Sequence, residues 1–171
     1  MTQPVKIGFG MYVLAAVLLI GLLTGLFSGL LGHRQNPNSN PQSKVDGTGS
    51  IKIELQRNNG GQYVASGWVN GDEVVFMLDT GATAVAVPLE FAEELALTPG
   101  RPVTSATANG YATVYTTMID ELRLGEIVEY QVPATLVPNL PGGQILMGMS
   151  FLKRLNFSQR GDTLILESNA R

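Results

Sequence analysis

The chain contains a single Asp-Thr-Gly triplet, residues 79–81, inside the segment VVFMLDTGATAVAVP. Apolar residues flank the triplet on both sides, and this pattern predicts a buried strand that ends on the carboxyl group of Asp79. Removing an unpaired carboxylate from water costs several kcal/mol, so a carboxyl group in this place needs a reason. Acid–base chemistry would be such a reason.

The neighbours of Asp79 are suited to supporting a working carboxylate. Gly81 lets the backbone pass close to the carboxylate and offers it an N–H, and Thr80 offers a hydroxyl group. Donors of this kind keep a carboxylate ionised or sharing a proton. Ala82 and Thr83 complete the loop. A plainer interpretation remains open, because Asp and Gly are also ordinary turn residues.

A second apolar stretch ends on a glycine, in the segment QILMGMSFL at residues 144–152. It predicts a short buried strand that stops at Gly148 and turns into a helix. A glycine in this place allows another segment to approach the backbone closely. We interpret Met147 and Met149, on either side of it, as packing residues.

The elements that must position these two segments are short and mostly extended. Turn signals such as Asn70-Gly71 and Asn109-Gly110 separate runs of β-branched and aromatic residues. Short helices are predicted over 88–97 and in MSFLKRLN at 149–156. The fold class is therefore mostly β with two short helices, as in a small barrel or sandwich.

Taken together and in this order, three segments resemble a retropepsin-type aspartic protease, and more narrowly the bacterial membrane-anchored group of that family. They are FMLDTGATAVAVP, the Asn-Gly hairpin about thirty residues later, and ILMGMSFLKRL. The resemblance extends from about Ser50 to Glu167. It implies a small closed barrel in which Asp79 is catalytic and residues 80–83 support the active-site loop.

The chemistry implied by this resemblance requires two facing carboxylates that share one proton. One takes a proton from the attacking water, and the other donates to the peptide carbonyl, without metal or cofactor. The chain has only one suitable triplet, because DGTG at 46–49 has the wrong order and GDT at 161–163 is interpreted as a turn. The second Asp79 must therefore come from another copy, which predicts a homodimeric endopeptidase acting on peptides or proteins.

The resemblance also implies a flap over the cleft, which we place at residues 104–114. Its tip would be Asn109-Gly110, whose sequence favours a tight type I′ turn, with Thr107 and Tyr111 beside it. A surface hairpin without any role in catalysis is the open alternative.

Composition argues against several other classes of protein. Eleven Lys and Arg residues against fourteen Asp and Glu residues give a net charge of −3, and no basic patch indicates nucleic-acid binding. The chain has no cysteine and one histidine, His33, which argues against a His-dependent triad and a His/Cys metal site. A glycosidase lacks a second motif-borne carboxylate. A retropepsin-like module that dimerises or binds peptides without cutting them remains the alternative to an enzyme.

The N-terminal region predicts a membrane anchor. Residues 7–31 carry no charged side chain, and as a helix they would reach about 37 Å, enough to cross a hydrocarbon core of roughly 30 Å. A cleaved signal peptide would have a shorter apolar region. We predict a tail at 1–6, a transmembrane helix at 7–31, a flexible linker at 32–48 and a protease domain at 49–171. The short N-terminus favours a single-pass bacterial inner-membrane protein with a non-cytoplasmic domain, although the flanking charges barely specify its orientation.

Overall fold

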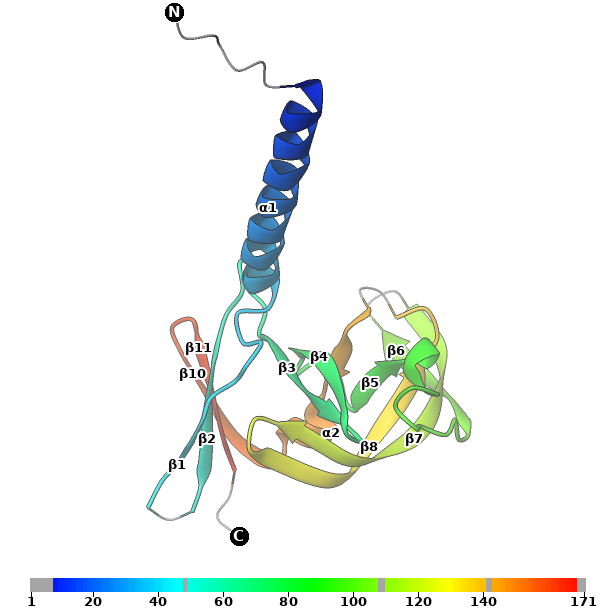
Figure 1. Ribbon diagram of the computed structural model, residues 1–171. Coiled ribbons are helices and arrows are strands. Elements are labelled where there is room, and N and C mark those ends of the chain that lie inside the picture. Colours follow the sequence, from blue (N-terminus) through cyan, green and yellow to red (C-terminus); the bar gives the residue numbers. More distant parts are fainter. Residues whose placement is uncertain (1–7, 48, 108–109, 141–142, 169–171) are drawn as a thin grey trace, which may run out of the picture.

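The structure is a computed structural model that describes residues 8–47, 49–107, 110–140 and 143–168 (Figure 1). A long helix, α1 (Phe9–Gln35), precedes two β-sheets, and a short helix, α2 (Met149–Leu152), lies between the last strands. The prediction of a mostly β fold is confirmed.

The smaller sheet joins the start and the end of the β region. Its strands are all antiparallel to their neighbours, and their order is β1 (Ser43–Val45), β2 (Ile51–Gln56), β11 (Thr163–Ser168) and β10 (Leu155–Arg160). Alternate residues of β2 and β11 are buried and contribute to the core, as the period of two along a strand requires.

The larger sheet contains the two segments that the sequence singled out. Its order is β3 (Val64–Val69), β4 (Asp72–Leu78), β9 (Ile145–Met147), β5 (Val85–Pro88), β8 (Ile127–Val137), β7 (Gly110–Leu124) and β6 (Pro102–Thr107). The strand β9 runs parallel to β4, and β5 runs parallel to β8. The segments around Asp79 and Gly148 therefore follow the carboxyl ends of two adjacent parallel strands and lie at the same end of the sheet.

One short contact joins β3, an end strand of this sheet, to β7, the strand next to the other end. The strand β3 also pairs with β7, through Trp68↔Arg123 and Val69↔Leu122. Gly67 permits this approach, because a Cβ in its place would collide with the carbonyl oxygen of Arg123. The closure of the barrel stays a prediction from the sequence, and these two residue pairs are the contact on which it would depend.

The hairpin predicted from Asn70-Gly71 is confirmed. These residues connect β3 to β4, with φ angles of +51° and +97°. Positive φ at both central positions matches the twist of the flanking strands, and Asn-Gly tolerates it better than other pairs.

The helix predicted over 88–97 is mostly wrong. The segment forms a 3-10 turn at Leu89–Phe91 followed by irregular turns, and Ala96 has a φ of +52°. The hydrogen bond from Leu97 N to Ala92 O, 2.7 Å, closes a loop wider than an α-helical turn and lets Leu97 enter the core. Pro99 also disfavours the α conformation at the residue before it.

The predicted linker over 32–48 is only partly separate from the domain. Asn38 is 6% exposed, and its amide donates to Gln56 O at 2.9 Å and Val64 O at 2.7 Å. The Oδ1 atom of Asn38 accepts from Gln56 N at 2.7 Å. The structure therefore differs from the flexible linker predicted from composition, because this one buried amide satisfies the ends of two strands.

The helix α1 projects away from the sheets (Figure 1) and exposes apolar side chains such as Leu18 and Ile20. Among the described residues, no helix combines the length and the apolar character needed to cross a membrane. The transmembrane span predicted over 7–31 therefore gains no support from the structure.

Candidate active site

Asp79 follows β4 directly and begins a tight loop. Its carboxylate accepts a hydrogen bond from Gly81 N, 2.8 Å from Oδ1, as the sequence predicted. The loop is closed by Ala82 N, which donates to the carbonyl of Asp79 at 3.2 Å. The Asp79 side chain is half-buried, so it remains accessible to water and to a second chain.

Gly148 lies against this loop, and its own φ of −88° suits any residue. A Cβ on Gly148 would collide with the carbonyl of Ala84 and would lie 2.7 Å from Ala82 O. The close crossing predicted for this glycine is therefore confirmed. Glycine is required here because no space is left for a Cβ atom, and not because of the backbone conformation.

Backbone hydrogen bonds join the two segments. Asp79 N donates to Met147 O at 3.2 Å, and Met149 N donates to Ala82 O at 2.8 Å. The residues around Gly148 thus fix the position of the Asp79 loop. Two glycine patterns that are remote in sequence form one local structure.

The surroundings of Thr80 and Thr83 differ from what the sequence predicted for residues that support the Asp79 loop. Thr80 and Thr83 are exposed, and within the described residues the Thr80 hydroxyl donates no hydrogen bond to Asp79. The strand β4 is also less buried than predicted, since Phe76 is its only fully buried residue. The face of the loop that carries Thr80 is therefore open in the single chain.

The hairpin proposed as a flap is present, although its tip is only partly described. The strands β6 and β7 pair from Pro102↔Tyr115 to Thr107↔Gly110, and Gly110 has a φ of +108°. Asn109 and the side chain of Thr107 lie outside the described residues. Tyr111 is 84% exposed beside the tip.

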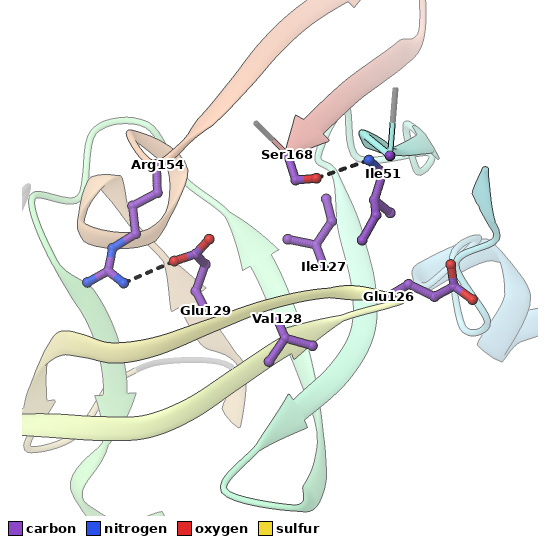
Figure 2. Close-up of a pocket in the computed structure, with 8 residues that line it drawn as sticks. Ile51, Glu126, Ile127, Val128, Glu129, Arg154 and Ser168 are labelled. Atoms are coloured by element: carbon purple, nitrogen blue, oxygen red, sulfur yellow. Dashed lines mark hydrogen bonds and ion pairs between the residues drawn. The ribbon is translucent and has the colours of Figure 1, made fainter. Parts of the chain in front are cut away.

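A cavity of about 400 Å³ lies away from the Asp79 loop. Figure 2 shows it between β8 of the larger sheet and β2 and β11 of the smaller sheet. Three of its polar side chains already have partners: Arg154 Nη1 donates to Glu129 Oε2 at 3.2 Å, and Ser168 Oγ accepts from Ile51 N at 3.0 Å. Asp79 does not line this cavity.

Metal ligands do not gather in the described ranges, where no three His, Cys, Asp or Glu side chains lie close enough to hold an ion.

Sequence reasoning missed one residue next to the Asp79 loop. Ser150 is 5% exposed, and its Oγ accepts a hydrogen bond from Val85 N at 2.9 Å. Its position two residues after Gly148 was the only local signal, because the partner is 65 residues away.

Comparison with known proteins gives consistent results for this region. Residues 65–154 match the family model described as "gag-polyprotein putative aspartyl protease". A Sinorhizobium protein described as "Uncharacterized protein in cobV 5'region" is 34% identical over 126 residues, covering 71% of this chain and 54% of that protein. The chain thus spans about half the length of that curated relative.

A solved structure extends the similarity to the fold. The crystal structure of a retropepsin-like aspartic protease from Rickettsia conorii is 26% identical, with a TM-score of 0.59, and covers 75% of this chain and 96% of that chain. The EIAV protease in complex with the inhibitor HBY-793 is 15% identical, with a TM-score of 0.47, over 58% of this chain and 92% of that chain.

Proposed function

Because this chain belongs to the gag-polyprotein aspartyl protease family and is retropepsin-like, we propose that it is an aspartic endopeptidase whose catalytic residue is Asp79. The observation that carries the proposal is the geometry of the loop. A half-buried carboxylate leaves a strand end, accepts a hydrogen bond from Gly81 N and is braced by the segment around Gly148.

The proposed mechanism uses two copies of this loop. Two carboxylates in contact hold one proton between them, because like charges at such short range cannot both ionise. The ionised carboxylate removes a proton from water as the water attacks the peptide carbonyl carbon. The protonated carboxyl donates its proton to the carbonyl oxygen, which gives a neutral tetrahedral intermediate with two hydroxyl groups. As the C–N bond breaks, the carboxyl that took the water proton gives it to the amine nitrogen, and the other carboxylate takes a proton from one hydroxyl group. No covalent acyl-enzyme forms.

A homodimer is proposed as the active form. Each chain supplies one Asp79, since the sequence contains a single Asp-Thr-Gly triplet. The exposure of Thr80 and Gly81 supports this arrangement, because the loop face that would meet a second copy is free of other described elements. The substrate would be an extended peptide or protein segment.

Membrane attachment through residues 7–31 is proposed with the protease domain on the non-cytoplasmic side. The uncharged sequence and the exposed apolar side chains in the described part of α1 support it. Alkaline carbonate extraction of membranes from expressing cells tests the attachment. Retention of the full chain in the pellet is expected, and its release into the supernatant would contradict an anchor.

A dimerising or peptide-binding module without activity is the second candidate, favoured by the exposed face of the Asp79 loop in the single chain. Substitution of Asp79 by Asn separates the two candidates, because an amide can neither share the proton nor activate water. We expect cleavage of a peptide library to disappear while the unfolding midpoint stays close to the wild-type value.

The matched control for this test is Asp72→Asn. Asp72 is exposed at the opposite end of β4, so it tests the same chemical change on the same strand. Cleavage by Asp79→Asn at the wild-type rate would rule out Asp79 as the catalytic residue. Binding of peptides without cleavage by the wild-type chain would favour the inactive module.

A further inference from the structure

The side chain of Ser150 reaches from α2 to the end of the Asp79 loop. Its Oγ accepts from the backbone N–H of Val85, the first residue of β5, at 2.9 Å. Both residues are buried, with Ser150 5% exposed and Val85 fully enclosed. A hydrogen bond shielded from water on both sides fixes two segments more firmly than a surface contact does.

This bond is the third of three that tie residues 147–150 to the loop. Asp79 N bonds Met147 O at the start of the loop, and Ala82 O accepts from Met149 N in its middle. Ser150 holds the end of the loop at Val85. It is the only one of the three bonds made by a side chain, so a substitution can remove it without altering the backbone.

The end of the loop matters for the direction of the carboxylate. The Asp79 carboxylate is oriented by Gly81 N, 2.8 Å from Oδ1, and Gly81 belongs to the same short loop. A shift of the loop end therefore moves the donor that aims the carboxylate. In catalysis a displacement of about 1 Å in a reacting group can cost roughly 100-fold in rate.

We propose that Ser150 is a positioning residue for Asp79. It acts through its hydrogen bond to Val85 N and through the loop that connects Asp79 to Val85. The inference rests on the proposed protease function and extends it to a residue outside the Asp-Thr-Gly triplet. Without the hydroxyl group, Val85 N would be buried without a partner, and the loop would move to find one.

The experiment compares Ser150→Ala with Ser150→Thr and with the control Ser66→Ala. Ser66 is another buried serine, 6% exposed, whose Oγ accepts from Asn36 Nδ2 at 3.1 Å. It lies on β3 opposite Val75 of β4, away from the loop. Removing either hydroxyl should lower the unfolding midpoint, but only Ser150 contacts the loop end.

For Ser150→Ala we expect kcat per folded dimer to fall by about 10-fold or more with KM changed less than about 2-fold, because the reacting group is displaced while the peptide-binding surface remains. Ser150→Thr keeps the hydroxyl and should recover most of kcat. Ser66→Ala should lose stability and keep kcat. A wild-type kcat in Ser150→Ala, or an equal loss in Ser66→Ala, would overturn the proposal.

Amide hydrogen exchange of residues 79–85 provides a readout that does not depend on activity. We expect these amides to exchange faster in Ser150→Ala than in wild type and in Ser66→Ala. If the wild-type chain cleaves no peptide, the proposed function fails, and exchange alone decides the loop-fixing role. Unchanged exchange at 79–85 in Ser150→Ala overturns the role of Ser150, whatever the activity.

Discussion

Two glycines beside Asp79 serve different needs. Gly81 supplies the N–H that meets Oδ1, and a Cβ on Gly81 would lie 3.1 Å from that oxygen. Gly148 supplies empty space where the carbonyls of Ala82 and Ala84 approach its Cα. The atoms that a Cβ at Gly148 would meet are backbone atoms, which cannot move aside as a flexible side chain can. The requirement for glycine is therefore stricter at Gly148 than at Gly81.

Replacing Gly148 by Ala should therefore destabilise the fold strongly. The added methyl group would force the two backbone segments apart, and we expect a loss of roughly 3 kcal/mol in the free energy of unfolding. Chemical denaturation measures it. The control is Gly47→Ala, because nothing lies within 4 Å of a Cβ at Gly47. Equal midpoints for the two variants would show that the crossing has room for a side chain.

At the scale of elements, two hairpins offer a comparison. The β6–β7 hairpin has Gly110 at its tip with a φ of +108°, and the β10–β11 hairpin has Gly161 with a φ of +59°. Neither glycine has an atom within 4 Å of the place of a Cβ, so conformation decides the effect of substitution at both. The two hairpins belong to different sheets, and only the first is proposed as a flap over the cleft.

Substitution of Gly110 by Val tests the flap. Positive φ is unfavourable for a β-branched residue, and we expect a loss of about 1–2 kcal/mol in stability for Gly110→Val and for the control Gly161→Val alike. If the β6–β7 hairpin closes over substrate, only Gly110→Val should also lose peptide turnover per folded dimer. Similar turnover in both variants would mean that the hairpin is a surface feature.

At the scale of the whole molecule, the single chain would supply half of the proposed two-carboxylate site. The loop face with Thr80 is exposed, Asp79 is half-buried, and the cavity lined by Arg154 and Ser168 lies elsewhere. A symmetric dimer would place two copies of the same loop against each other and complete the site. Activity should then follow the concentration of dimer.

A mixing experiment tests this assembly. When equal amounts of wild type and Asp79→Asn exchange subunits, about a quarter of the dimers contain two aspartates. We expect the activity to be roughly half of that shown by the same amount of wild type alone, because mixed dimers are inactive. Sedimentation at the assay concentration checks that dimers exist. In the control, the same amount of an unrelated, inactive protein replaces the Asp79→Asn variant. Activity that stays unchanged when the variant is mixed in would indicate that each chain works alone.

The sequence by itself determined the features that depend on neighbouring residues. Asn70-Gly71 set a turn because two adjacent residues tolerate positive φ. The turn signals between short extended runs indicated the mostly β class, and the patterns around Asp79 and Gly148 singled out the two segments that meet in the candidate site. The closeness of Gly81 N to the carboxylate followed from its place two residues along the chain.

Only the tertiary structure decided the contacts between remote segments. Ser150 meets Val85 across 65 residues, and Asn38 joins β2 to β3, although composition had indicated a flexible linker. It also showed that β4 is half-exposed, contrary to its apolar sequence. The physical reason is that a hydroxyl or an amide carries no local sign of its partner: burial fixes which distant N–H or carbonyl must be satisfied, and burial exists only once the sheets have packed.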